Sequence, residues 1–413
     1  MKREVLRRLE GHTVATVVTV AFLLRAALAT LVRVVEDGIL FEDDGSYIRT
    51  LSTFANQGRE GLTSSQRGTW DALWGFFEPL GWLVRFASTD PLVPMLATAL
   101  AGSLVAGLVS AMTRRRFSDR MALVAGLLVA LMPSQILWSS LVLRDAFSWL
   151  ALSSIALMIG TSSSKWRRGS AWFALPVVLY WLNGIRGHTF LVASIASALA
   201  LLFTFRRRLQ WIAALALVLL AVGVASGTIG RLTSVLDSGT AGRQEELTAA
   251  VDAGKTTIAC VVIPFVYEAP SDGVGWSGDL KCFPSGARMM LFDPFPNQLG
   301  KSLSLLPAFF EHVFWYPLLY LAFRGVRRLR GWTTQDVFVL AAGLGTLCVW
   351  ALVDRNFGTA YRHRGEFFWA VAYFSTIGLH DLVTKSTAPA HSLSARIRGR
   401  LVPDEPRCSP RSR

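Results

Sequence analysis

Residues 13–32 have the sequence TVATVVTVAFLLRAALATLV, an apolar run of the length that crosses a lipid bilayer. Arg25 is the one charged residue within it, and we expect this side chain to face the protein interior or to extend to an interface. No small-residue cleavage site follows the run, so we interpret it as an uncleaved first membrane span. The basic residues that precede it, which indicate a cytoplasmic N-terminus, are Lys2, Arg3, Arg7 and Arg8.

The composition of the whole chain agrees with a membrane protein. Of the 413 residues, 52% are hydrophobic and 17% are charged, whereas a soluble protein carries about 25% charged residues. The formal net charge of +14 does not indicate nucleic-acid binding, because the basic residues fall in short clusters between apolar runs, as in cytoplasmic loops. The sequence contains no C-x-x-C pair, no zinc-ligand spacing and no phosphate-binding glycine loop.

The alternation of apolar runs and basic clusters predicts an all-α integral membrane protein with about ten transmembrane helices and both termini in the cytoplasm. In this topology every compact basic cluster lies on the cytoplasmic side. Residues 1–383 form the transmembrane domain, and residues 384–413 form a basic, disordered cytoplasmic tail. After the first span, the others are expected at about residues 92–112, 122–137, 146–160, 171–182, 189–205, 211–226, 305–323, 337–353 and 367–382.

Two longer segments lie outside the membrane in this topology. Residues 35–90 hold an acidic cluster and an aromatic stretch at residues 70–79, which we interpret as helices lying on the outer surface. A re-entrant segment over residues 74–87 is the alternative. Residues 227–301, rich in Gly, Ser, Thr, Asp and Pro, form the long outer loop.

The chain has four cysteines. Cys260 and Cys282 both lie in the long outer loop, which is an oxidising location, so we predict a disulfide between them. Cys348, within an expected span, and Cys408, in the tail, are expected to be free thiols.

Three carboxylates, Glu42, Asp43 and Asp44, follow the first span in the sequence FEDDGSY of residues 41–47. Ionised side chains beside a membrane are costly and tend to mark function. We predict that Asp43 or Asp44 is catalytic, as the general base that takes the proton of an acceptor hydroxyl. The same two carboxylates are the candidates for a divalent cation, Mg²⁺ or Mn²⁺. The structural alternative is a wetted loop, or acids that cap the helix beginning near Tyr47.

Polar residues also fall at the outer ends of other expected spans, and we predict that they bind substrate. Arginines can hold a phosphate group by two hydrogen bonds and stabilise charge that develops on it. Each group also has a structural alternative. Arg144 and Asp145 could form a local ion pair at a helix start, and Arg186 near His188 could anchor the chain at the interface. Arg362, His363 and Arg364 could snorkel to the membrane surface. The predicted substrate-binding residues are Glu42, Tyr47, Arg144, Asp145, Arg186, His188, Arg362, His363 and Arg364.

Four blocks of sequence resemble a known family, the bacterial multi-pass glycosyltransferases of the C type together with related membrane proteins of polysaccharide assembly. The resemblance implies that Asp43 or Asp44 is the catalytic base and that Arg362 and Arg364 bind the donor phosphate. The residue after Pro296 is Asn297, where the family block has Trp. The four blocks are DDGSY (43–47), PSQILWSSLVLRD (133–145), DPFP with the later Glu311 and Trp315-Tyr316 (293–316), and NFGTAYRHR (356–364).

These observations together predict an enzyme of envelope glycan assembly at the outer face of the bacterial cytoplasmic membrane. It would transfer a sugar from a polyprenyl-phosphate donor to a glycan or lipid-linked acceptor, with membrane lipids as its surroundings and no nucleic acid as partner. The absence of a nucleotide-binding motif favours the lipid-phosphate donor. One alternative is an O-antigen- or capsule-type polysaccharide polymerase or ligase. A transporter or flippase of lipid-linked sugars ranks third, because we find no clear internal repeat.

Overall fold

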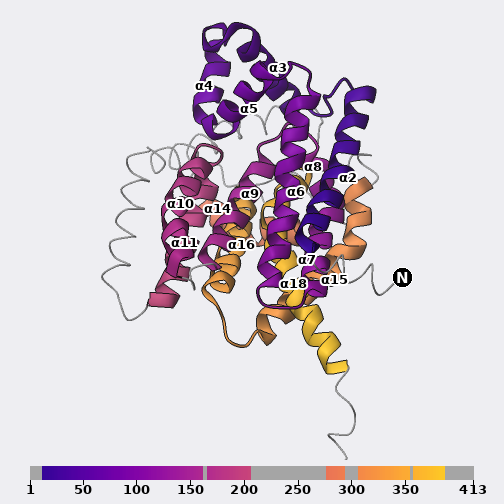
Figure 1. Ribbon diagram of the computed structural model, residues 1–413, viewed down its shortest axis with the longest axis vertical. Helices are drawn as coiled ribbons and strands as arrows, with labels where there is room; N and C mark the ends of the chain where they lie inside the picture. The colour runs from indigo at the N-terminus through magenta and orange to yellow at the C-terminus, as the bar shows by residue number, and fades with distance from the viewer. Residues whose placement is uncertain (1–11, 161–164, 206–275, 294–305, 354–356, 387–413) are drawn as a thin grey trace, which may run out of the picture.

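The computed structural model describes residues 12–160, 165–205, 276–293, 306–353 and 357–386. Within these ranges the regular secondary structure is helical and contains no strand (Figure 1). The long helices run side by side in one bundle, and short helices from the N-terminal third of the chain cover one end of it (Figure 1).

Three helices of the described ranges are long and apolar enough to cross a membrane: α2 (Thr13–Val35), α6 (Leu92–Arg114) and α16 (Thr334–Val353). A fourth span results if α7 (Asp119–Leu131) and α8 (Pro133–Ser139), which meet at a bend of 59°, are counted together. The prediction of an all-α membrane architecture is therefore confirmed.

Except for α14 (Trp276–Phe292), which lies in the segment expected to be the outer loop, the remaining long helices overlap the spans expected from the sequence. The span expected at residues 211–226 lies outside the described residues, as does the tail after residue 386. These further helices are α9 (Asp145–Gly160), α10 (Lys165–Asn183), α11 (Gly187–Phe205), α14 (Trp276–Phe292), α15 (Leu306–Arg328) and α18 (Gly365–Ser386).

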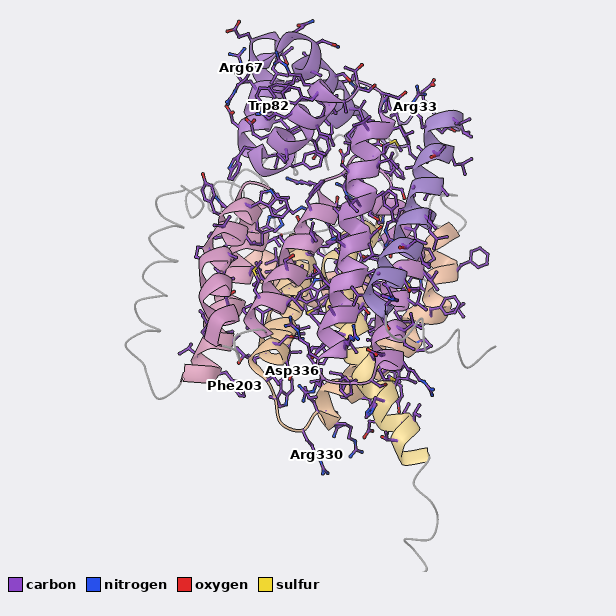
Figure 2. The ribbon with its side chains drawn as sticks, in the orientation of Figure 1. Arg33, Arg67, Trp82, Phe203, Arg330 and Asp336 are labelled. Carbon is purple, nitrogen blue, oxygen red and sulfur yellow. The ribbon has the colours of Figure 1, made fainter. Side chains whose placement is uncertain are left out.

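The two ends of the bundle differ in composition. At one end, which we call the basic end, Arg116 forms an ion pair with Asp336 and donates to the backbone carbonyls of Arg330 (3.1 Å) and Gly331 (2.9 Å). This contact joins the segment just after α6 to the α15–α16 connection and to the first turn of α16. Figure 2 labels Arg330 and Asp336 at this end of the bundle. The opposite end, which we call the cap end, carries the short helices from the N-terminal third of the chain (Figure 1).

The cap consists of α3 (Glu42–Gln57), α4 (Ser64–Ala72) and α5 (Trp74–Phe86) around an aromatic core. The ring of Trp70 stacks on Phe54 at 4.3 Å and on Phe77 at 5.1 Å, measured between ring centroids. These residues belong to the segment that the sequence predicts to form surface helices, and the helices are present.

The turn between α2 and α3 directly precedes the three acidic residues that begin α3. Gly38 has a φ of +86°, and a Cβ atom there would come within 2.8 Å of the Pro91 side chain, so the turn requires glycine. Arg33, in the last turn of α2, donates to Asp90 (3.0 Å) just before α6. The α2–α3 turn is thereby tied to the start of α6.

Pro133 breaks the helix between α7 and α8, because proline has no N–H to donate to the carbonyl of Val129. Arg25 is fully buried and supplies the missing donors: it bonds to the carbonyls of Val129 (3.2 Å) and Ala130 (3.1 Å) and to Ser139 Oγ (2.7 Å). The expectation that Arg25 faces the protein interior is confirmed.

Part of the expected outer loop belongs to the bundle. Helix α14 lies within residues 227–301 and packs along α16, with Gly286 against the backbone of Ala351 so closely that a Cβ atom would overlap it. Small residues allow such close approach of membrane helices. The predicted Cys260–Cys282 disulfide and the Cys408 thiol fall outside the described side chains, while Cys348 is free, as expected.

Candidate functional site

A series of ion pairs connects the cap to the interior of the bundle. Arg362 Nη1 donates to Asp43 Oδ2 (2.6 Å), and the same guanidinium donates through Nε to Asp145 Oδ2 (2.8 Å). Asp145 Oδ1 accepts from Arg186 Nη2 (2.7 Å), and Arg186 Nη1 donates to Glu366 Oε1 (2.6 Å). We call these five residues the ion-pair chain.

The exposed fraction of the side chains decreases along the ion-pair chain, from the cap toward the interior of the bundle. The Asp43 side chain is 63% exposed and that of Arg362 is 12% exposed, whereas Asp145 and Glu366 are fully buried. A buried charge is tolerated when partners neutralise it and saturate its hydrogen bonds. Asp43 is thus the member of the chain that a ligand arriving at the cap end can reach.

Each member of the ion-pair chain lies at or beside a helix end. Asp43 and Glu366 lie in the first turns of α3 and α18, and Asp145 is the first residue of α9. Carboxylates are stabilised there by the unpaired N–H groups and by the dipole of the helix. Arg362 lies in α17 (Phe357–His363), and Arg186 lies between α10 and α11. The bundle gathers these ends because its helices run side by side.

Asp44 has different surroundings from Asp43. Its carboxylate is fully buried and accepts hydrogen bonds from the backbone N–H groups of Leu40 (3.1 Å), Phe41 (2.9 Å) and Gly45 (2.9 Å). Burial raises the pKa of the Asp44 carboxyl, and the backbone hydrogen bonds oppose that shift. Of the two predicted catalytic acids, Asp44 stabilises the start of α3, and Asp43 belongs to the ion-pair chain.

The two acids also do not form a joint cation site. Asp44 directs both oxygens at backbone N–H groups, while Asp43 pairs with Arg362. Across the ranges that the structure describes, no three His, Cys, Asp or Glu side chains gather as metal ligands.

Arg144 and Tyr47 lie next to the ion-pair chain. Arg144 is half-buried, and its Nε is buried without a hydrogen-bond partner in the described part of the chain. It is close enough to Arg186 and Arg362 to interact with both electrostatically. The Tyr47 ring packs on Phe76 at 5.4 Å, which places it in the cap core. Glu42 is exposed.

The two histidines that were predicted to bind substrate, His188 and His363, both contact the indole ring of Trp350. His363 is buried and stacks on that ring with a centroid distance of 3.4 Å, and His188 meets it edge-on at 4.7 Å. The guanidinium of Arg186 lies over the same ring at 5.1 Å. Trp350 also donates its indole N–H to Glu366, so this aromatic side chain orders the inner end of the ion-pair chain.

Arg364 belongs to a separate buried network, although the sequence groups it with Arg362. Its Nε donates to the carbonyl of Met290 (2.9 Å) at the end of α14, and its Nη1 is 3.4 Å from His312 Nε2. The guanidinium also lies 4.9 Å from the ring centroid of Trp315. These contacts fasten α14 and α15 to the start of α18, and they leave Arg362 as the arginine that faces Asp43.

Residue types alone did not identify four further members of this region: Glu366, Trp350, Glu311 and Tyr361. Glu311 is fully buried and accepts from Ser134 N (2.7 Å) and Tyr361 OH (3.0 Å). The available signal was an ionisable residue inside an apolar run, which is costly unless it is paired. Glu366, at the start of the last apolar run, carries the same signal.

The arrangement combines a reachable carboxylate with a guanidinium whose position is fixed from behind. Asp43 can accept a proton or yield its place on Arg362 to another anion. Arg362 can bind an anion without reorganisation, since Asp145 holds its remaining N–H groups.

No family model matches the chain, and comparison with curated proteins and with solved structures finds no match.

Proposed function

We propose that this protein is a membrane glycosyltransferase that moves a sugar from a polyprenyl-phosphate donor to a glycan or lipid-linked acceptor. The observation that carries the proposal is the 2.6 Å contact between the exposed Asp43 carboxylate and Arg362. Sugar transfer from a phosphate ester needs one group that takes a proton and one that stabilises a departing phosphate. Asp43 and Arg362 are those two groups, side by side at the cap end.

The reaction follows from these two roles. Asp43 accepts the proton of the acceptor hydroxyl while the hydroxyl oxygen attacks the anomeric carbon of the sugar. The bond between that carbon and the phosphate oxygen breaks, and the polyprenyl phosphate leaves with the electron pair. Arg362 donates hydrogen bonds to the phosphate and stabilises its added charge.

The donor phosphate replaces Asp43 on Arg362 in this scheme. Asp43 Oδ2 occupies the hydrogen-bonding position of Nη1, which is the one that faces the cap. When the phosphate takes that position, the carboxylate is released for the acceptor hydroxyl. Arg144, whose Nε has no partner in the described residues, supplies further donors beside Arg362.

The proposed orientation places the cap end outside the cytoplasmic membrane of a bacterium, with about ten spans and both termini inside. The support is the distribution of arginines, because cytoplasmic loops of membrane proteins are rich in Lys and Arg. The basic end carries Arg114, Arg115 and Arg116 at and just after the end of α6, and Arg324, Arg327 and Arg328 in the last turns of α15.

The test is sugar transfer by the full-length protein in lipid nanodiscs, with a panel of polyprenyl-phosphate sugars. Asp43→Asn and Arg362→Lys are expected to lower kcat by at least 100-fold, which is the usual contribution of a general base or of a charge-stabilising donor. Asp37→Asn is the matched control. Asp37 lies in the turn between α2 and α3, before Asp43, and its side chain is 97% exposed. Full activity of Asp43→Asn contradicts the general-base role.

A polysaccharide polymerase or ligase is the second candidate, and the observation that favours it is the surplus of arginines around Asp145. Arg186 and Arg362 form ion pairs with this carboxylate, and the neighbouring Arg144 interacts with it electrostatically. Such an enzyme would bind a lipid-linked oligosaccharide through cations and would not depend on Asp43. Loss of activity in Arg144→Lys and Arg362→Lys with full activity in Asp43→Asn therefore identifies this function.

A further inference from the structure

Two routes of contact begin at the Glu311 carboxylate and lead to the two partners of the Asp43–Arg362 ion pair. Glu311 lies in α15 and is fully buried. Its Oε2 accepts from the backbone N–H of Ser134 (2.7 Å) and from the hydroxyl of Tyr361 (3.0 Å), and its Oε1 accepts from Ser134 Oγ (2.9 Å). One carboxylate thus joins α15 to α8 and to α17.

The first route runs through Tyr361 to Arg362. Tyr361 is 2% exposed and directly precedes Arg362 in α17. Its hydroxyl is held by Glu311, so the orientation of this short helix depends on that bond. Since α17 is a helix of two turns, a rotation at Tyr361 moves the guanidinium of Arg362 relative to Asp145 and Asp43.

The second route runs through α8 to Asp43. Ser134 lies in the first turn of α8, and Trp138 lies one turn later on the same helix. The Trp138 ring contacts Phe41 with a centroid distance of 5.1 Å. Phe41 is the N-cap residue of α3, two positions before Asp43. The position of α8 therefore influences where α3 begins.

The break before α8 explains why a carboxylate is required at this point. In a continuous helix the Ser134 N–H would donate to the carbonyl of Ala130. Arg25 occupies that carbonyl instead (3.1 Å), so the Ser134 N–H needs another acceptor inside the bundle. Glu311 is that acceptor, and its two oxygens also accept from the hydroxyl groups of Ser134 and Tyr361.

We propose that Glu311 is a positioning residue, which holds α8 and α17 so that Asp43 and Arg362 meet. This inference rests on the proposed function, since sugar transfer is the reaction that the position serves. The contacts themselves can be tested without that reaction. Misplacing reacting groups by about 1 Å can lower turnover on the order of 100-fold.

The first arm of the test is hydrogen–deuterium exchange of the full-length protein in nanodiscs. Glu311→Gln is expected to speed amide exchange at least threefold in residues 41–46 and 357–364, because glutamine keeps only one of the two acceptor oxygens that the two routes use. Tyr361→Phe keeps the ring and removes one hydrogen bond, so it speeds exchange in residues 357–364 alone. Unchanged exchange in both variants overturns the proposal.

The matched control is Tyr373→Phe. The Tyr373 hydroxyl donates to Asp336 Oδ1 (2.7 Å), which is a second buried tyrosine–carboxylate bond, located at the basic end. This variant is expected to leave exchange in residues 41–46 and 357–364 unchanged. Equal acceleration by Tyr361→Phe and Tyr373→Phe would mean a general loss of packing and would also overturn the proposal. If Glu311→Gln does not fold, Tyr361→Phe and its control still decide whether the bond from Tyr361 to Glu311 holds α17.

The second arm is turnover with a polyprenyl-phosphate sugar. Tyr361→Phe is expected to lower kcat about 10- to 100-fold, with Tyr373→Phe within twofold of the unmodified protein. A kcat equal in the two variants contradicts the positioning role. If the unmodified protein transfers no sugar, the proposed function fails, while the exchange measurements still decide whether Glu311 holds α8 and α17.

Discussion

Asp43 and Arg362 are separated by 319 positions in the sequence, and their side chains form an ion pair of 2.6 Å at the cap end of the bundle. The guanidinium reaches this position because Asp145, at the start of α9, accepts from its Nε and Nη2. An exposed acid is thereby held on a partner that is itself immobilised. Ligand binding, stability and turnover should respond differently to changes at these three residues.

Asp43→Asn is expected to tighten the binding of polyprenyl phosphate about two- to fivefold, although it should lower kcat at least 100-fold. The carboxylate competes with the phosphate for Arg362, and an exposed ion pair of this kind is worth about 0.2–1 kcal/mol. Thermophoresis with a labelled polyprenyl phosphate in nanodiscs measures the affinity. Asp37→Asn removes the same charge near the same end of the bundle without touching Arg362, and it should not change the affinity. Weaker binding by Asp43→Asn would show that Asp43 helps to hold the donor.

Asp145→Asn is expected to lower the free energy of unfolding by about 3–5 kcal/mol. Asp145 is fully buried and neutralises both Arg186 and Arg362, so its loss leaves two buried guanidiniums with less compensation. Thermal unfolding in detergent, followed by tryptophan fluorescence, measures the change in the free energy of unfolding. A loss below about 1 kcal/mol, the range of exposed pairs, would mean that other groups neutralise the two arginines.

Asp44→Ala is expected to lower the free energy of unfolding by about 1–3 kcal/mol, because buried backbone N–H groups at the start of α3 lose their acceptor. Asp44→Asn keeps one carbonyl oxygen and should cost less. The variants are compared with Asp43→Asn in the same unfolding assay, where Asp43→Asn should have little effect owing to its exposure. Equal stability of Asp44→Ala and the unmodified protein would contradict the structural role of Asp44.

Arg25→Met is expected to destabilise the break between α7 and α8. The carbonyls of Val129 and Ala130 and the hydroxyl of Ser139 lose their donors, and each buried polar group left unpaired costs about 1–3 kcal/mol. Methionine fills a similar volume, so the loss of hydrogen bonds can be separated from a loss of packing. Proteolysis between residues 131 and 140 should become faster. Unchanged protection there would indicate that the bend does not need Arg25.

The local pattern of the sequence was sufficient for the membrane architecture. Apolar runs of about 20 residues can lower their free energy only by forming helices in lipid or in a helical core. A helix overlaps each expected span that lies within the described residues, although α14 was not expected. Arg25 faces inward because a charge within such a run needs partners. The grouping of Asp43 with Arg362 also followed from topology, since both were expected at one face.

Tertiary structure decided which charged residues pair. Asp43 and Asp44 are neighbours in the sequence, but one step along a helix turns a side chain by about 100°, so one faces Arg362 and the other faces the backbone of the preceding turn. Arg364, two positions after Arg362 and beyond the end of α17, faces α14 and α15 instead. Such differences depend on how helices distant in sequence pack together, and no local pattern of apolar and polar residues encodes that packing. The sequence by itself therefore determined a helical membrane protein with an acidic and an arginine-rich segment at one end, and only the packed bundle selected Asp43 and Arg362 as the pair that meets.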